Sequence, residues 1–354
     1  MNTKAYLKLL EYSLKEGDIP QDLYDSTIAE IQKDGKMTKR VYSYYINELE
    51  KRRLFYADGT PFNPENSAKT DGTYIYKHTK NPFWYIGHAF FSTIFKFLGW
   101  IGGGIGYGIW RVKDAKKFKK LGACITLSNH VGYLDALITR RALGCRKQYI
   151  IAAPHNCKPT VGGAVLRSAT VLPLPISFAG ARPFNEMLEY VAKRKAAIHF
   201  YAEQSLWLHY RKPRPYKEGA FIYADRLDIP VVPMLYCFRD PKGLRKLFGM
   251  PKVVVRIADP LYVDRSLAPA KRKKDLCDRA YAAAVALYED FYGVPMKYIE
   301  NDEPTDVIAD DNNCATPGGT NDCAAKDVST DTQIVGDGAE LQTPPQETEI
   351  IRNE

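Results

Sequence analysis

The sequence predicts an α/β fold: a mostly parallel sheet flanked by helices, with an N-terminal helical extension and a membrane-dipping two-helix segment. The chain of 354 residues, 45% of them apolar, is long enough to bury a sizeable core. Between Gly122 and Asp264, short apolar β-prone runs alternate with helical runs. This alternation is typical of parallel strands joined by crossover helices. Ligands of such folds bind at the carboxyl ends of the strands, so we expect functional residues where these runs end.

We place this main domain at residues 111–299. Its strand-like runs are ACITLSN, QYIIAA, AAIHFYAE, PVVPMLYCF and KVVVRIADP, and the helical runs include FNEMLEYVAKRK and GAFIYADRL. The run KRKKDLCDRAYAAAVALYEDFYG places its apolar residues at helical spacing and predicts a helix that closes the domain.

Residues 1–60 are predicted to form a helical N-terminal extension. KAYLKLLEYSLKEG and TKRVYSYYINELEKRRLF both show helical spacing of apolar residues, and the first ends in glycine. We interpret these helices as an appendage packed on the main domain. Because two helices followed by a basic third helix are also typical of a helix-turn-helix, that DNA-binding motif remains an alternative. Residues 61–81 are rich in turn formers and are predicted to be a linker.

Residues 82–110 are predicted to associate with a membrane. The stretch is aromatic, almost uncharged, and long enough for a bilayer span of about 20 residues. However, Lys96 lies in its middle, and GGGIGYG is expected to break a straight helix. Basic residues flank both ends, which gives no crossing orientation. We therefore expect two short helices that dip into one leaflet, with Trp84, Trp100 and Trp110 at headgroup depth. A buried core hairpin and a single span remain alternatives.

Charge is unevenly distributed along the chain. Residues 300–354 hold 14 acidic and two basic residues, so residues 1–299 carry a formal charge of +21 although the whole chain carries +9. A body this basic favours anionic partners: a phospholipid surface, phosphorylated metabolites, an acidic carrier protein or nucleic acid. The acidic segment, poor in aromatic residues, is predicted to be a disordered tail.

The seven cysteines form no CxxC pair, and their number is odd. This pattern argues against a disulfide framework or a zinc ribbon. The opening stretch MNTKAYLKLLEYSLKEGDIP lacks the apolar run of a signal peptide. We therefore expect the protein to face a reducing cytoplasm.

The segment TLSNHVGYLDALI contains His130 and Asp135, five positions apart. Two residues five positions apart do not lie on the same face of a regular helix. The two side chains can therefore meet only across a turn, which Gly132 allows. We expect a strand, a turn over NHVG, and a helix from about Tyr133 whose first turn aims Asp135 at His130. A carboxylate on one imidazole nitrogen fixes the tautomer and increases basicity at the other. The pair is suited to taking a proton from a hydroxyl group.

Two other interpretations of His130 and Asp135, a structural histidine and a metal site, remain open from these residues alone. A lone histidine is more often a hydrogen-bonded structural group than a catalyst, and a metal site would need a third ligand that the neighbouring sequence does not offer. No GxSxG nucleophile motif is present. A base here would therefore activate a hydroxyl of the substrate itself.

Together with three later blocks, this segment resembles the glycerolipid acyltransferase family, the PlsC-type enzymes that acylate glycerol 3-phosphate and lysophosphatidic acid. Asn129, His130 and Asp135 match the family's NHxxxxD block, and GGAVLR, which ends at Arg167, loosely matches its second block. IPVVPMLY fits the fourth block, an apolar strand with an internal proline at Pro233. PYKEGAF resembles the family's lysine–x–glycine–alanine element.

The third block departs from the family pattern, which reads roughly FPEGTRS. FYAEQSLW keeps Phe200, Glu203 and the hydroxyl of Ser205. It places Leu206 where the family often has a cation near the acceptor. Basic residues follow shortly after, in HYRKPRP, and Arg214 among them is a candidate to replace that cation, unless the run is a solvated loop.

The resemblance implies catalytic roles for the first block. His130 would be the general base on the acceptor hydroxyl, Asp135 would orient the imidazole, and Asn129 with nearby backbone N–H groups would position the thioester or its oxyanion. The remaining candidates would bind substrate, Arg167 through the acceptor phosphate. They are Arg167, Glu203, Ser205, Lys217, Gly219 and Arg214. No metal and no cofactor beyond the acyl co-substrate are expected.

The function implied is transfer of a fatty acyl group from acyl-CoA or acyl carrier protein to lysophosphatidic acid, giving phosphatidic acid. Another lysophospholipid, a lyso-aminolipid or glycerol 3-phosphate remains an alternative acceptor, and a non-catalytic lipid or nucleic-acid binder is an alternative of another class. We expect the protein at the cytoplasmic face of the cell membrane, peripheral, monotopic or with a single span, on an anionic lipid surface. No nucleic-acid partner is expected, because mere binding does not need an oriented base.

Overall fold

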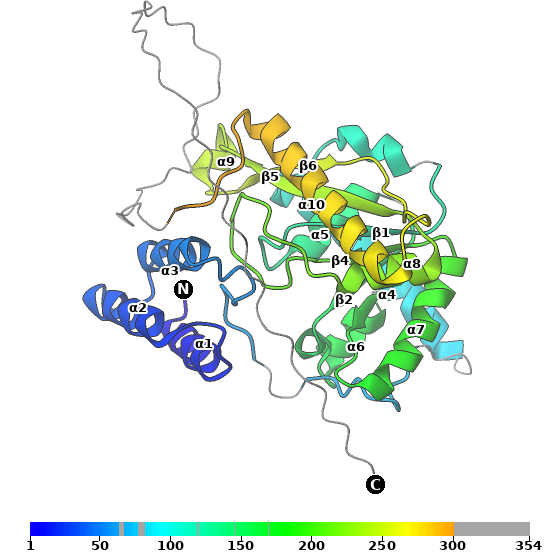
Figure 1. Ribbon diagram of the computed structural model, residues 1–354, viewed down its shortest axis with the longest axis horizontal. Coiled ribbons are helices and arrows are strands. Elements are labelled where there is room, and N and C mark those ends of the chain that lie inside the picture. The colour runs from blue at the N-terminus through cyan, green and yellow to red at the C-terminus, as the bar shows by residue number, and fades with distance from the viewer. Residues whose placement is uncertain (64–66, 77–81, 119, 145, 169, 301–354) are drawn as a thin grey trace, which may run out of the picture. The chain divides into compact units, whose positions relative to one another are not determined.

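The computed structural model of the protein describes residues 1–63, 67–76, 82–118, 120–144, 146–168 and 170–300. The predicted acidic tail, apart from Glu300, lies outside these residues, as does part of the predicted linker. Figure 1 shows a sheet with helices on both of its faces and three N-terminal helices beside it.

Within the described residues, six strands form the sheet in the order β3-β2-β4-β1-β5-β6. All pairings among the first five strands are parallel, and β6 pairs with β5 in the antiparallel direction. The prediction of a mostly parallel sheet is therefore confirmed. The bounds are β1 Cys124–Leu127, β2 Gln148–Ala152, β3 Val171–Pro173, β4 Ala197–Phe200, β5 Val231–Arg239 and β6 Lys252–Ile257. The central strand β1 is buried at every residue, as expected for a parallel strand covered on both faces.

The helices cover the two faces of the sheet unequally. Apolar residues of α7, α8 and α10 pack on one face against alternate residues of the strands, and α5 packs on the other. Their bounds are α5 Asp135–Leu143, α6 Val161–Ser168, α7 Phe178–Lys193, α8 Gly219–Leu227, α9 Leu244–Leu247 and α10 Pro269–Tyr292. Two 3₁₀ helices, Lys113–Phe118 and Pro154–Cys157, lie in the connections. The predicted closing helix is α10.

The N-terminal extension is a three-helix module with a core of its own. It comprises α1 Thr3–Lys15, α2 Gln21–Lys33 and α3 Lys39–Lys51. The side chains of Asn2 and Thr38 cap α1 and α3 by accepting hydrogen bonds from backbone N–H groups of the first turn. Its core also includes Trp207, which belongs to the main domain in sequence. The prediction of N-terminal helices is confirmed, and this indole is one of the places where they meet the rest of the chain.

The prediction of two short membrane-dipping helices is wrong in shape. The segment forms one helix, α4 Pro82–Ile101, which continues into a π-helical turn at Gly102–Gly106. The glycines act as spacers against α5: a Cβ atom on Gly99, Gly102 or Gly103 would lie 2.6–2.8 Å from side-chain atoms of that helix. The glycines thus let two helices approach closely, and the regular α-helix ends at Ile101, directly before the glycine run that was expected to break it.

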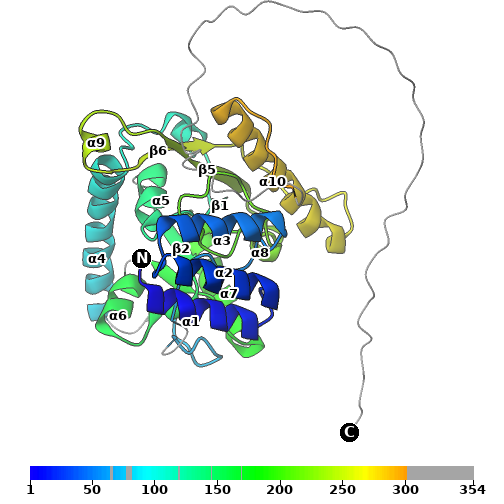
Figure 2. The ribbon, with the colours of Figure 1, turned by 90° about the vertical axis from the view of Figure 1, so that its left-hand side faces the viewer.

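The outer surface of α4 is apolar and exposed. Its large side chains are between 41 and 79% exposed at Phe83, Tyr85, Ile86, Phe90, Phe97, Leu98 and Trp100. A buried core hairpin is therefore excluded. Among the described residues, one helical stretch, Tyr85–Gly106, has the length and composition to cross a membrane, with a mean hydropathy of 1.2. Figure 2 shows α4 standing at the side of the domain, with α9 at one end.

Candidate active site

The turn after β1 brings His130 and Asp135 together, as the sequence predicted. His130 Nδ1 lies 2.8 Å from Asp135 Oδ2, and α5 begins at Asp135 itself. The same carboxylate oxygen accepts hydrogen bonds from the backbone N–H groups of Val131 at 2.7 Å and Gly132 at 3.0 Å. These bonds fix the carboxylate and leave Nε2 as the imidazole nitrogen that can meet a substrate.

Gly132 is needed at this turn for a reason that differs from the predicted one. Its backbone does not lie in the left-handed region. Instead, a Cβ atom at this position would lie 3.0 Å from Asp135 Oδ1 and 3.6 Å from the Tyr107 hydroxyl. The absence of a side chain therefore leaves room for the carboxylate, and chain flexibility is not the cause.

The imidazole of His130 is held flat against the ring of Tyr201. The two rings stack with centroids 4.2 Å apart and an interplanar angle of 18°. The His130 side chain is 23% exposed, whereas that of Asp135 is 1% exposed. A partly exposed imidazole on a buried carboxylate is the arrangement that a general base requires, because the base must reach a substrate while its orienting partner stays out of water.

A second histidine also contacts the ring of Tyr201. His199, on β4, meets that ring edge-on at 4.6 Å and is fully buried. Its ring nitrogens lie 3.0 Å from the Thr126 hydroxyl and 3.2 Å from the Ser128 hydroxyl. Burial, with His130 nearby, lowers the pKa of His199 to about 3. This histidine is neutral and structural.

Asn129 anchors the end of β1 to β5. Its side-chain amide donates to the Tyr236 carbonyl at 3.1 Å and accepts from the Tyr236 N–H at 2.8 Å. The backbone N–H of His130 points at Glu203 Oε2, 3.4 Å away, and the next two N–H groups bind Asp135. The amide of Asn129 and the N–H groups of this turn thus bind the protein itself. Asn129 and these N–H groups were predicted to position the thioester, whereas in the structure their hydrogen bonds are made within the protein.

Glu203, Ser205 and Arg214 form a buried polar cluster behind the turn. Each side chain is at most 2% exposed. The Arg214 guanidinium donates to Glu203 Oε2 at 3.0 Å and to the Ser205 hydroxyl at 2.6 Å, and it also donates to the Phe55 carbonyl at 2.9 Å. Burial raises the pKa of Glu203, against the opposing effect of Arg214. These three residues were predicted to bind substrate, but their hydrogen bonds and burial make them an internal support.

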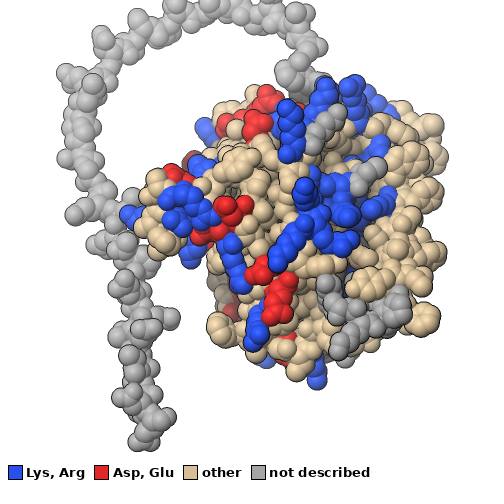
Figure 3. All heavy atoms as spheres, turned by 90° about the vertical axis from the view of Figure 1, so that its right-hand side faces the viewer, with Lys and Arg blue, Asp and Glu red and all other residues tan. Residues whose placement is uncertain are grey.

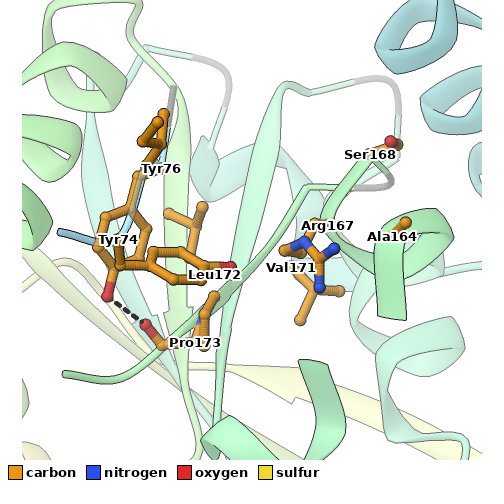
Figure 4. Close-up of a pocket in the computed structure, with 9 residues that line it drawn as sticks. Tyr74, Tyr76, Ala164, Arg167, Ser168, Val171, Leu172 and Pro173 are labelled. Atoms are coloured by element: carbon orange, nitrogen blue, oxygen red, sulfur yellow. Dashed lines mark hydrogen bonds between the residues drawn. The ribbon is translucent and has the colours of Figure 1, made fainter. Parts of the chain in front are cut away.

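The other predicted binding residues lie outside this cluster. Arg167, on α6, donates to the carbonyls of Cys157 at 3.0 Å and Lys158 at 3.1 Å, and it lines a pocket of about 130 Å³ between α6 and β3. Figure 4 shows its guanidinium in this pocket. β3 is separated from β1 by β2 and β4, so the structure does not place Arg167 directly beside His130. Exposed Lys217 lies over the Tyr56 ring at 4.5 Å, and Gly219 begins α8.

Sequence reasoning missed three residues that shape the site: Tyr201, Tyr236 and Trp207. Tyr201 follows Phe200, which ends β4 and is a recognised position of the third block. The alternation of side chains along a strand places Tyr201 on the same face as His199, and the two rings are in contact. Trp207 was visible in FYAEQSLW, but its burial depends on the N-terminal helices.

A family match agrees with the sequence motifs. Residues 110–237 match the Acyltransferase family, a range that contains all four motif blocks, and the resemblance to an acyltransferase family is therefore confirmed. The chain is also similar to the crystal structure of the 1-acyl-sn-glycerophosphate (LPA) acyltransferase, PlsC, from Thermotoga maritima. The sequence identity is 14% and the TM-score 0.30, with 56% of this chain and 96% of that chain covered. No curated protein matches the chain significantly.

Proposed function

We propose, because residues 110–237 match the acyltransferase family, that the protein transfers a fatty acyl group from a thioester to the free hydroxyl of lysophosphatidic acid. The donor is acyl-CoA or acyl carrier protein, and the product is phosphatidic acid. The observation that carries this proposal is the 2.8 Å contact between His130 Nδ1 and the buried Asp135 carboxylate.

In the proposed reaction, His130 Nε2 takes the proton of the acceptor hydroxyl as its oxygen attacks the thioester carbonyl carbon. A C–O bond forms, and the carbonyl electron pair moves to oxygen. Collapse of this tetrahedral intermediate breaks the C–S bond, and the departing thiolate takes the proton back from the imidazolium. Asp135 stabilises the imidazolium between the two steps, in the way a buried carboxylate supports other histidine bases.

We assign recognition of the acceptor phosphate to basic residues outside the buried cluster. Arg214 is fully buried and engaged, whereas Arg167 lines a pocket and Lys217 is exposed. Figure 3 shows Lys and Arg side chains gathered on one face of the molecule, in agreement with the basic body of the chain. Arg167→Ala is expected to raise the apparent KM for a phosphorylated acceptor; an unchanged KM would remove Arg167 from the phosphate site.

We also propose that the protein works at the cytoplasmic face of the cell membrane, on an anionic lipid surface. The exposed apolar side chains of α4 support this location, since contiguous exposed apolar surface of this kind marks a membrane or partner contact. The acceptor and the product are amphiphiles, so a surface enzyme meets both without extracting them from the bilayer.

The test is a panel of acceptors presented with acyl-CoA or with acyl carrier protein, with thiol release as the readout. Lysophosphatidic acid should give the largest kcat/KM. Leu206, which replaces the family's cation, favours a different acceptor as the second candidate, so the panel includes glycerol 3-phosphate, other lysophospholipids and a lyso-aminolipid. Absence of thiol release with every acceptor would refute acyl transfer, and steeply salt-dependent DNA binding would then favour a binding protein.

A further inference from the structure

The hairpin between β5 and β6 carries an exposed apolar tip that the proposed acyl transfer does not use. The tip is α9 and the residue after it, between Gly243 and Gly249, which both have left-handed φ values. Leu244 is 72% exposed, Leu247 75% and Phe248 69%. Large apolar side chains this exposed on three of five consecutive residues are not scattered surface residues but a patch.

This tip is joined to the end of α4. The Arg245 guanidinium donates to the Ile105 and Gly106 carbonyls at 2.6 Å each, and to the Pro251 carbonyl. Gly108 leaves room for that guanidinium, since a Cβ atom there would lie 3.0 Å from it. The tip and the end of α4 are thus held as one unit, and Figure 2 shows them adjacent.

Around the junction, α4 and its π-helical turn add further exposed apolar side chains. Trp100 is 56% exposed, Ile105 52% and Trp110 67%. Tryptophan is typical of the headgroup depth of a bilayer. We call the combined surface the α4–α9 patch; it comprises Trp100, Ile105, Trp110, Leu244, Leu247 and Phe248.

Charge around the patch indicates its occupant. Lys242 and Lys246, on the hairpin, are exposed, and Arg111 and Lys113 follow Trp110 in sequence. The hairpin itself has one acidic residue, Asp240, which lies 3.8 Å from Arg211. Apolar side chains fringed by lysines match a bilayer with anionic headgroups, where the chains insert and each lysine strengthens binding about fivefold.

We propose that the β5–β6 hairpin is a second membrane contact, which inserts beside α4 into the surface of an anionic bilayer. Two contacts joined by Arg245 fix the domain's rotation about α4, whereas one helix alone would leave it free. The inference rests on the membrane location proposed above, but the vesicle-binding experiment that decides it needs no acyl transfer.

The experiment is sedimentation of the full chain with phosphatidylcholine vesicles, with and without phosphatidylglycerol. The variant L244S/L247S/F248S should bind the anionic vesicles at least tenfold more weakly than the wild type. A matched control, I222S/Y262S/V294S, removes three exposed apolar side chains elsewhere and should bind as the wild type does. K242Q/K246Q should weaken binding only to vesicles that contain phosphatidylglycerol.

Equal binding by the hairpin variant and the wild type would overturn the proposal, as would an equal loss in both triple variants or a wild type that binds no vesicles. A monomer–dimer shift in the hairpin variant without a change in vesicle binding would instead assign the patch to a second copy of the chain. Acyl transfer to a water-soluble short-chain acceptor should survive in the hairpin variant, so failure of the catalytic proposal is seen separately.

A different set of contacts links the N-terminal module to the catalytic turn. The backbone N–H of Trp207 donates to the His130 carbonyl at 3.1 Å, and that of His209 donates to the Val131 carbonyl at 2.8 Å. The same short segment is held from the other side by the N-terminal module. The Trp207 indole donates to the Ala57 carbonyl at 2.9 Å, and the Leu208 N–H donates to the Tyr42 hydroxyl at 2.6 Å.

We infer that Tyr42 and Trp207 are positioning residues, through which the N-terminal module holds His130 against Tyr201. Tyr42→Phe leaves the Leu208 N–H without its acceptor and should loosen the segment. Tyr45→Phe is the matched control: Tyr45 is also a buried tyrosine of α3, but its hydroxyl donates to the Asp58 carbonyl and, within the described part of the chain, makes no hydrogen bond to residues 207–209.

The readouts are kcat, KM and the rate at which diethyl pyrocarbonate modifies His130, followed by mass spectrometry. Tyr42→Phe should lower kcat several-fold with little change in the acceptor KM, and it should speed the modification of His130. Tyr45→Phe should change neither. Equal effects of the two variants on His130 modification would overturn the inference, and since this readout needs no turnover, it stands apart from the proposed activity.

Discussion

His130 and His199 both contact the ring of Tyr201, yet their surroundings give them opposite properties. His130 stacks on Tyr201, is partly exposed and faces a carboxylate. His199 meets the edge of the same ring, is fully buried and faces two hydroxyl groups. The comparison teaches that the partner and the exposure of an imidazole, and not its presence, decide whether it can serve as a base.

The largest expected effect comes from removing the exposed imidazole. His130→Gln keeps a planar polar side chain of similar size but cannot take a proton from a hydroxyl. We expect kcat to fall by about 10²- to 10⁴-fold, the usual contribution of a general base. Thiol release measures the loss, and an unchanged melting temperature shows that the fold is intact. Normal acyl transfer by the purified variant would contradict the proposed mechanism.

The next effect tests the carboxylate that distinguishes His130 from its neighbour. Asp135→Asn retains an oxygen that can accept the N–H groups of Val131 and Gly132 but removes the charge that faces the imidazolium. We expect kcat to fall about 10²-fold with a smaller change in acceptor KM. A kcat equal to that of the wild type would contradict this role. It would mean that the negative charge of Asp135 is not required and that neutral partners, such as the hydroxyl groups around His199, could support the base equally well.

The buried histidine should affect stability and leave catalysis almost unchanged. Its folded pKa of about 3 lies below the ordinary value, so the unfolded chain binds its proton first, and stability falls as the pH drops below about 6.5. The loss amounts to about 1.4 kcal/mol per pH unit until the folded pKa is reached. His199→Asn should show a correspondingly shallower loss in urea unfolding between pH 6 and pH 4. Parallel curves for variant and wild type would contradict this.

The smallest effect is expected at the ring that both histidines share. Tyr201→Phe keeps the stacked ring but removes a hydroxyl that lies 3.2 Å from Thr139 Oγ1. We expect a loss of about 1 kcal/mol in unfolding free energy, typical of one hydrogen bond, and less than a fivefold change in kcat. A larger fall in kcat would mean that the phenol itself takes part in the reaction.

Local patterns were sufficient to predict the sheet, the N-terminal helices and the contact between His130 and Asp135. Each depends on residues close in sequence: alternating apolar runs, helical spacing, and a glycine between a histidine and an aspartate. The closing helix was likewise predicted from its own periodicity and is observed at Pro269–Tyr292. Interactions between residues close in sequence determine these features, so they can be predicted from the sequence.

The misplaced features all depend on distant partners. The glycine run after Ile101 was expected to separate two short helices, but Gly102 and Gly103 also serve as spacers against α5, some 40 positions later in the chain. Glu203, Ser205 and Arg214 were expected at the substrate, but the carbonyl of Phe55, about 150 residues earlier, completes their buried cluster. Asn129 was expected to contact the thioester, but its side-chain amide makes two hydrogen bonds to the backbone of Tyr236.

The sequence by itself determined which chemical groups are present and where short segments turn, and this includes the carboxylate that accompanies His130. Only the tertiary structure decided which groups remain accessible, because burial depends on elements that approach from far along the chain. It made His199 neutral, gave Arg214 a structural role and left the side chains of α4 and α9 exposed. The physical reason is that hydrogen bonds and desolvation act over a few ångströms in space, whatever the separation in sequence.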